Sequence, residues 1–371
     1  MRPIVVTTTQ DLDDYSDRWE GLRRASGGNV YNNLDLIKIW LETYQKAATP
    51  NIILIEEGKD LVGIAPLVNS VYRTKGLPLR TLSLVGGVPN CMMLLSNSIL
   101  FLPGRKDALE LIVGEMKRLK WSVLSTKFMA DGDAVRQFTQ MAHYTWHTVD
   151  EPSSTMMNVP IRDSGDITEG FDKHARRTIK RTLRLIDREG HHIQFRKIAL
   201  DDLDRSVGAY VQQHIERWGS RGGSIFLDPN NTKFLRKALR IRYNGGGGYA
   251  YELLLDGEVA GQLFGFQEGD TAFGFRLGMN DSFSKFSPGW LVFYHAFLDL
   301  RERGVRWCAL GFGEEKYKFE MGSKTMPLVG ITATRGIVSV ANRISRIGRD
   351  HQKKGDAEAT EGPGREPVSN P

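Results

Sequence analysis

The sequence predicts an α/β protein of two tandem domains, each a mixed, mostly antiparallel sheet flanked by helices, with a disordered C-terminal tail. Three observations favour this class. The chain has 371 residues, 40% hydrophobic and 25% charged, which suits a globular protein long enough for two domains. Stretches with helical spacing alternate with short apolar strands. A strand, a Gly turn and a small-residue strand occur once in each half, which indicates duplication of one α/β unit.

The first half contains stretches with the spacing of amphipathic helices and others that read as strands. The predicted helices cover residues 12–24, 34–44 and 107–119. The predicted strands form a hairpin over 51–68, further short strands over 77–95 and a last strand from Trp121. This N-terminal domain is expected at 1–155, and a linker rich in Pro, Ser and Asp is expected at 156–167.

The second half is expected to form a domain over 168–335. Its predicted helices cover residues 168–188, 203–218, 234–243 and 288–303. Its predicted strands cover residues 192–198, 271–277 and 305–310, and residues 249–266 are predicted to form a hairpin of two strands that turns at Asp256 and Gly257. In both halves an amphipathic helix precedes a strand that carries a Trp, either Trp121 or Trp307. This similarity supports duplication, although hairpins and helix–strand pairs also recur in unrelated α/β proteins.

The cysteines and the first residues of the chain indicate the cellular compartment in which the protein is expected. The two cysteines, Cys91 and Cys308, lie in apolar stretches and read as reduced core residues. No metal-binding spacing is present, so no metal is expected. The first residues lack the apolar region of a signal peptide, and no apolar run is long enough to cross a bilayer. The expected compartment is therefore the cytoplasm.

The inferable chemistry is concentrated in residues 286–324. Ser287, Pro288 and Gly289 open an apolar helix, with Pro where its missing N–H costs nothing. The first amides of a helix have no internal partner, so this start can bind a phosphate or a diphosphate. A strand and a Gly-rich turn follow, and then comes a polar run: Glu314, Glu315, Lys316, Tyr317 and Lys318. The same residues also fit a helix, a strand and a solvated loop without a function.

The order S-P-G, helix, strand, G-x-G-E-x-x-Y-K-F-x-x-G resembles the C-terminal signature of GNAT-superfamily acyltransferases of the two-domain, CelD-like kind. These are related to the Fem-type aminoacyl ligases. The resemblance extends more weakly over residues 19–334. It implies tandem GNAT-like domains and acetyl-CoA or another acyl-CoA as donor. The segment departs from the usual GNAT phosphate loop, in which Gln or Arg precedes G-x-G/A, because residues 286–290 offer one Gly and one Pro.

The resemblance and the needs of acyl transfer suggest roles for individual residues. The donor's phosphates are assigned to Ser287, Gly289 and Trp290. Lys318 would stabilise the oxyanion, since a lysine in a similar K-x-x-F-G context is implicated in this step in Fem-type ligases. Glu314 is the candidate base, with Glu315 as its alternative, and Tyr317 is the candidate proton donor.

Two further groups of residues could contact ligands. His214, Arg217 and Trp218, in an H-x-x-R-W arrangement, either line an acceptor pocket or hold the end of their helix. The formal net charge of +6 and the pI of about 9.2 permit phosphorylated ligands. Much of this charge lies on one predicted helix: Lys173, Arg176, Arg177, Lys180, Arg181, Arg184 and Arg188. These stripes fit a solvated face, a phosphate contact in a small ligand or RNA, although the interleaved aromatics of a single-strand binder are missing.

The end of the chain divides into two parts. Residues 336–350 fit a basic amphipathic helix, which either packs on the parent domain or makes a peripheral membrane contact through 337–349. Residues 351–371 have little to bury and are expected to be disordered.

The preferred function is transfer of an acyl group, in the simplest case acetyl, from acyl-CoA to an amine or hydroxyl. The acceptor would be a small molecule or a lipid- or nucleotide-linked sugar of cell-envelope or polysaccharide synthesis. Two alternatives remain open: a Fem-type aminoacyl ligase that uses charged tRNA, and a non-catalytic scaffold in polysaccharide synthesis at the membrane.

Overall fold

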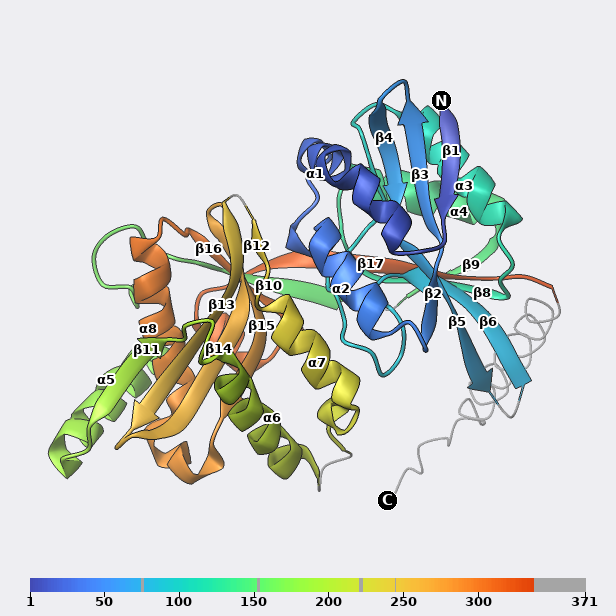
Figure 1. The fold of residues 1–371 in the computed structure, drawn as a ribbon. Helices are drawn as coiled ribbons and strands as arrows, with labels where there is room; N and C mark the ends of the chain where they lie inside the picture. Colours follow the sequence, from blue (N-terminus) through green and yellow to red (C-terminus); the bar gives the residue numbers. More distant parts are fainter. Residues whose placement is uncertain (75–76, 152–153, 220–222, 244, 337–371) are drawn as a thin grey trace, which may run out of the picture.

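The computed structural model describes residues 1–74, 77–151, 154–219, 223–243 and 245–336, which form an α/β structure in two halves (Figure 1). The first half comprises β1 (Arg2–Val6), η1 (Gln10–Tyr15), α1 (Ser16–Ala25), η2 (Val30–Asn32), α2 (Leu34–Thr43), β2 (Ala48–Pro50), β3 (Ile52–Glu57), β4 (Asp60–Ala65), β5 (Leu67–Thr74), β6 (Leu77–Leu84), β7 (Leu100–Phe101), α3 (Lys106–Arg118), β8 (Val123–Ala130), α4 (Asp133–Thr145) and β9 (His147–Asp150). The second comprises β10 (Ser154–Pro160), α5 (Lys173–Glu189), β11 (Ile193–Lys197), α6 (Leu203–Gly219), η3 (Ile225–Leu227), α7 (Pro229–Ala238), β12 (Arg242–Tyr243), β13 (Gly246–Leu255), β14 (Glu258–Glu268), β15 (Thr271–Met279), η4 (Asp281–Phe286), α8 (Pro288–Glu302), β16 (Trp307–Phe312), α9 (Lys316–Glu320) and β17 (Lys324–Thr334).

Most strands of the described residues pair in one long sheet with the order β11-β13-β14-β15-β16-β10-β17-β8-β6-β5-β2. A second, smaller sheet has the order β1-β3-β4-β7. The pairs are antiparallel except for β6 with β8 and β15 with β16. The predicted class, a mostly antiparallel α/β protein flanked by helices, is therefore confirmed.

The two parallel strand pairs occupy equivalent positions in the order of elements of the two halves. In the first half, β6 is followed by α3 and then by the parallel strand β8; in the second half, β15, α8 and β16 repeat this order. Trp121 and Trp307, which the sequence picked out, both follow the crossover helix. The repeated crossover supports duplication of one α/β unit.

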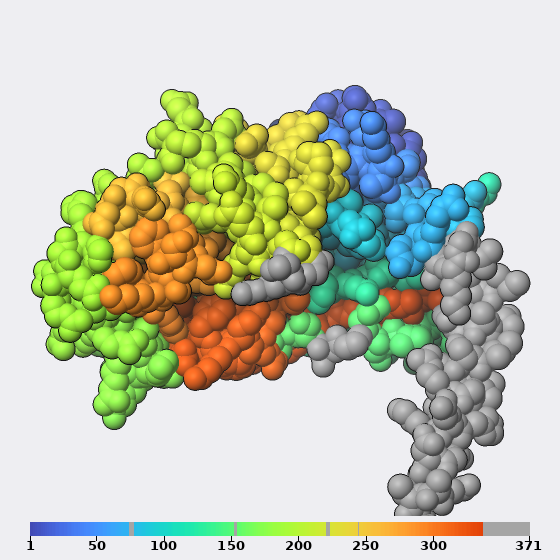
Figure 2. Space-filling model, turned by 90° about the horizontal axis from the view of Figure 1, so that it is seen from below, coloured from blue at the N-terminus to red at the C-terminus, as the bar shows by residue number. Residues whose placement is uncertain are grey.

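The strands of the two halves pair with one another where the halves meet. β10 lies between β16 and β17, and β17 in turn pairs with β8 and β9 of the first half. Figure 2 shows the orange and red residues of this C-terminal region running from one half into the other. Part of the predicted linker is thus a strand, because Met157 and Val159 of β10 point into a core while the neighbouring Pro and Asp residues hide the pattern. Where the two domains divide stays a prediction.

The helices cover both faces of the long sheet. In the second half, α5 and α8 pack on the face that carries Tyr249 and Tyr251, while α6 and α7 pack on the opposite face, behind Phe264 and Phe266 (Figure 1). The core around α6 and α7 continues into that of α1 and α2, where Tyr31 contacts Phe266 at a ring distance of 6.2 Å. The two halves therefore share one apolar core as well as one sheet.

Two local predictions were wrong. The helix predicted at 234–243 is α7, which begins at Pro229 because the Asp228 side chain accepts the Asn230 amide, and ends at Ala238. Within 77–95 only β6 is a strand, and the residues after Leu84 form turns around Gly86, whose φ is 85°. The predicted helix at 336–350 and tail at 351–371 lie outside the described residues except for Gly336.

Candidate functional site

The start of α8 lies at the carboxyl end of β15. Pro288 occupies the first helical turn, and Ser287 precedes it in a left-handed conformation with a φ of 45°. The Ser287 hydroxyl makes no capping hydrogen bond, while its carbonyl accepts the Trp290 amide at 3.0 Å. The first turn contains no acidic side chain. The free hydroxyl and the positive end of the helix dipole together favour an anion at this tip.

Gly289 lets the helix tip sit against β15. A Cβ atom at this position would lie 2.5 Å from the Met279 sulfur, so a larger residue would require the flexible Met279 side chain to move aside. The Trp290 ring packs against the core beside Phe171 at a centroid distance of 6.4 Å, and its role at the donor's phosphates stays a prediction. Ser287 and Gly289 are thus at the tip, whereas the Trp290 ring braces the helix.

β16 runs parallel to β15 and ends at the same edge. The strands pair only from Thr271 to Phe273 with Trp307 to Ala309, and beyond this they have no common register. Carboxyl ends of parallel strands next to a helix start are the usual ligand position in such a crossover. The polar turn and α9 follow β16 directly, and the Tyr317 ring stacks on Phe293 of α8 at 6.2 Å. The structure thus brings the two parts of the sequence signature together.

Lys318 is buried, with 2% of its surface exposed. Its Nζ donates to the Phe312 carbonyl at 2.7 Å and the Gly313 carbonyl at 3.3 Å, and it contacts Glu315 Oε2 at 2.8 Å. An ammonium has three N–H donors, so these partners use all of them. In this arrangement Lys318 fixes the turn that ends β16.

The acidic candidates and the tyrosine lie around this turn. Glu314 Oε1 accepts a hydrogen bond from the Thr155 hydroxyl of β10 at 3.0 Å. Burial opposes ionisation of Glu315, but the hydrogen bond and charge of Lys318, together with a backbone hydrogen bond, outweigh it and lower the pKa of this carboxyl. Burial raises the pKa of Tyr317, so its phenol stays protonated.

The His214, Arg217 and Trp218 group is connected to the helix tip. Arg217 Nη1 lies 3.7 Å from the carboxylate of Asp281, which opens the segment leading to α8. His214 Nδ1 lies 2.8 Å from the Ser224 hydroxyl, and burial, together with the charge of Arg276, lowers its pKa. Trp218 is 41% exposed at the end of α6. These residues therefore lie beside the segment that carries the tip.

Arg276, whose charge acts on His214, was not singled out from the sequence. It lies on β15 beyond the paired part, and its Nη2 contacts Met92 Sδ of the first half at 2.6 Å. Its Nε is buried without a hydrogen-bond partner among the described residues. An arginine in a strand such as 271–279 gives no sequence signal for this position, because only the fold brings Met92 to it.

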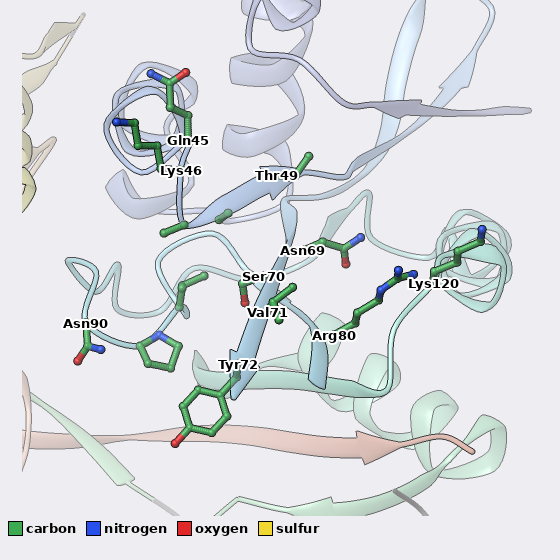
Figure 3. A pocket seen from close by; sticks show the side chains of 14 residues that line it. Gln45, Lys46, Thr49, Asn69, Ser70, Val71, Tyr72, Arg80, Asn90 and Lys120 are labelled. Carbon is green, nitrogen blue, oxygen red and sulfur yellow. The ribbon is translucent and has the colours of Figure 1, made fainter. Parts of the chain in front are cut away.

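A hollow of about 620 Å³ lies in the first half, near β5 and the end of α2 (Figure 3). Figure 3 shows the side chains of Asn69 and Arg80 pointing towards the segment that carries Lys120. The Asn69 Oδ1 atom is buried without a partner among the described residues. Asn90, which also lines this hollow, accepts the Asn231 amide at 3.1 Å and so links it to the second half.

Two structural findings concern metals and membranes. Among the described residues, His, Cys, Asp and Glu nowhere gather in a group of three or more that could hold a metal ion. No helix in the same part of the chain has the length and apolar character that crossing a membrane requires. Cys308 is a buried free thiol, and burial raises its pKa to about 12.

The chain is similar to a known domain family and to several solved structures. Residues 173–319 match the family model described as an acetyltransferase (GNAT) domain. The structure of FemX is similar to this chain with a TM-score of 0.58 and 12% identity, covering 89% of this chain and 97% of FemX. A search of curated proteins found no match.

Two further solved structures are similar to this chain. A conserved protein of unknown function from Bacteroides thetaiotaomicron has a TM-score of 0.54 and 10% identity, covering 90% of this chain and 100% of its own. The C-terminal domain of a putative lysylphosphatidylglycerol synthetase from Agrobacterium fabrum has a TM-score of 0.51 and 10% identity, covering 90% and 95%. At these identities the similarity concerns the fold.

Proposed function

Because this chain is a GNAT-superfamily protein with the two-domain fold of FemX, as its sequence predicts, we propose that it transfers an acyl group from acyl-CoA to an amine or hydroxyl. The acceptor we propose is a sugar or another precursor of the cell envelope or of a polysaccharide. The observation that carries this proposal is the crossover β15–α8–β16, which lies inside the matched GNAT domain and brings a helix tip without acidic residues to the polar turn after β16.

The reaction would proceed through one tetrahedral intermediate. The acceptor nitrogen or oxygen attacks the thioester carbon, its proton passes to a base, and collapse of the intermediate breaks the C–S bond and releases the thiol. We assign the donor's phosphates to Ser287 and Gly289, the base to Glu314 and the proton for the leaving sulfur to Tyr317. Burial raises the pKa of Tyr317, which keeps its phenol protonated before transfer but makes it a weak acid, so its proton would move only as negative charge develops on the leaving sulfur.

Lys318 has two roles in this proposal. It first holds the turn after β16 through the carbonyls of Phe312 and Gly313. It can reach an oxyanion only when one of its three partners leaves, and the Glu315 carboxylate, 57% exposed, is the partner whose release costs least. A charged donor at the oxyanion is worth about 3–4 kcal/mol of transition-state stabilisation in a water-excluded site.

The alternative is a Fem-type ligase that takes an aminoacyl group from tRNA. Two observations favour it: the fold of FemX and the exposed cations of α5. The second alternative, a non-catalytic scaffold, predicts that Lys318→Ala leaves the biological output unchanged.

Thiol release from acetyl-CoA, measured with a panel of amino sugars and hydroxylated sugar phosphates, tests the proposal. We expect acceptor-dependent release that Glu314→Gln reduces by about 10²-fold, the lower end of a general base contribution. Thermal shift with acetyl-CoA and with charged tRNA provides the comparison. Stabilisation by charged tRNA alone would establish the ligase, and stabilisation by neither together with no thiol release would leave the scaffold.

A further inference from the structure

The cations of α5 line a hollow of about 1070 Å³ beside the segment that leads to α8. Its lining includes Arg177, Lys180, Arg181, Arg184 and Arg188 of α5 together with Lys285 of η4. Glu189 pairs with Arg188 at 3.7 Å and with Lys285 at 2.7 Å. The other four cations form no ion pair with any described residue, so the hollow carries a strong uncompensated positive charge.

α5 extends along both parts of the site. At its C-terminal end, Lys285 pairs with Glu189, and the Phe286 ring, next to Ser287, lies 5.0 Å from His191. At its N-terminal end, the Asp172 amide donates to the Glu320 carbonyl of α9 at 2.8 Å. The apolar side of α5 packs against α8 through Ala175, Ile179 and Ile186, which leaves its basic side facing outwards. A ligand whose diphosphate is bound at the α8 tip would therefore have the part beyond the diphosphate next to the cations of α5.

This inference rests on the proposed function and identifies where the donor's nucleotide lies. We propose that the hollow holds the phosphorylated nucleotide of acyl-CoA and that Arg181 and Arg184 bind its 3′-phosphate. In coenzyme A this phosphate is separated from the diphosphate by one ribose, so both groups can be bound at once by two adjoining elements. The guanidinium groups of arginine match the oxygen geometry of a phosphate and donate to it bidentately.

The size and composition of the hollow favour a small ligand over a nucleic acid. The cations from Arg177 to Arg188 span about 16 Å of helix, and the volume is that of a site for one ligand. The lining contains one imidazole, His174, but no Phe, Tyr or Trp side chain, so it offers no series of rings on which successive bases could stack.

The test compares coenzyme A with its 3′-dephospho form by calorimetry on the full chain. We expect the wild type to bind coenzyme A about tenfold more tightly, which is the order expected for charge-assisted hydrogen bonds to one phosphate. Arg181→Gln with Arg184→Gln should remove this difference and leave the affinity for 3′-dephospho-CoA within about twofold of wild type. Arg176→Gln is the matched control, because Arg176 lies on the same helix but does not line the hollow.

Each outcome is decisive. If the two nucleotides bind equally to the wild type, or if the double variant weakens both alike, the inference is wrong while acyl-CoA remains the donor. If neither nucleotide binds and no thiol is released from acetyl-CoA, the proposed function fails as well. Binding of charged tRNA that depends on Arg181 and Arg184, without binding of coenzyme A, would assign the hollow to nucleic acid and overturn the inference.

Discussion

Replacing Lys318 with Met should destabilise the protein as well as impair transfer. The ammonium is 2% exposed and supplies the hydrogen bonds of the Phe312 and Gly313 carbonyls, at 2.7 and 3.3 Å. Leaving these two part-buried acceptors unpaired costs at most about 1–3 kcal/mol each, whereas the exposed Glu315 contributes at most about 1 kcal/mol. Removing the buried charge returns part of this cost, so we expect a net loss of about 2–4 kcal/mol.

For a protein of this size, such a loss should lower the Tm by roughly 3–5 °C, which a circular dichroism melt measures directly. Glu315→Gln is the matched control, because it removes the ion pair and leaves both carbonyl contacts, and its Tm should change by less than about 2 °C. If Lys318→Met melts within about 1 °C of wild type, the carbonyl contacts contribute nothing to stability, and the assignment of Lys318 to the turn is refuted.

Three further predictions concern other parts of the structure. Gly322→Ala should cost about 2–4 kcal/mol in urea unfolding, because Gly322 has a φ of 74° and a Cβ there would lie 2.2 Å from the Gly170 carbonyl oxygen; a change below about 1 kcal/mol would contradict this. Burial and Arg276 lower the pKa of His214 from 6.5, so the unfolded state binds more protons and stability falls as the pH drops below 6.5; His214→Gln should flatten the fall of the urea midpoint between pH 7 and pH 5, and an unchanged slope would exclude His214 as its source. Arg23→Leu should cost about 2–3 kcal/mol at pH 7, because it leaves the partly buried Glu268 carboxylate, 2.5 Å from Arg23 Nη1, without its partner; since burial raises the pKa of Glu268, the loss should shrink at pH 5, and a loss that is equal at both pH values would be evidence against it.

Elements with local signals were predictable from the sequence. α2 begins where the Asn33 side chain accepts the Leu36 amide, and α5 begins where Asp172 accepts the Ala175 amide. The β13–β14 hairpin turns at Asp256-Gly257, as that pair predicts. In each case a capping or turn residue only a few positions away defines the element, so the sequence contains the information.

The strands at the junction of the halves were not predictable in this way. β17 contains Pro327 and Gly330, which normally argue against a strand. Here Pro327 lies opposite Thr155 of β10, and Gly330 allows the Thr126 carbonyl to approach within 2.1 Å of where a Cβ would be. Both features depend on strands contributed by distant parts of the chain, which no local pattern reveals.

The features of the candidate site also divide into those that local sequence defines and those that depend on distant segments. Ser287, Gly289, Tyr317 and Lys318 belong to one continuous motif, so the sequence indicated them together, and the crossover of β15 and β16 explains why they meet. The burial of Lys318 and the contact of Arg276 with Met92 depend on packing between segments far apart in the sequence. The sequence could therefore suggest residue types for the chemistry but not which of them are already paired.

The duplication raises the question of which crossover binds the anionic donor, and the two helix starts differ in the relevant respect. In the first half, Asp107 lies in the first turn of α3 and accepts the Ala108 amide at 3.0 Å, while Arg105 before it pairs with Glu57 at 2.7 Å. The charges at that tip are thus already neutralised by the protein's own carboxylates. The first turn of α8 has no acidic side chain, and the only polar group placed to cap it, the Ser287 hydroxyl, makes no capping bond. Since a helix dipole favours an anion most where no side chain already plays that part, the second crossover is the one at which we propose that the diphosphate of acyl-CoA binds.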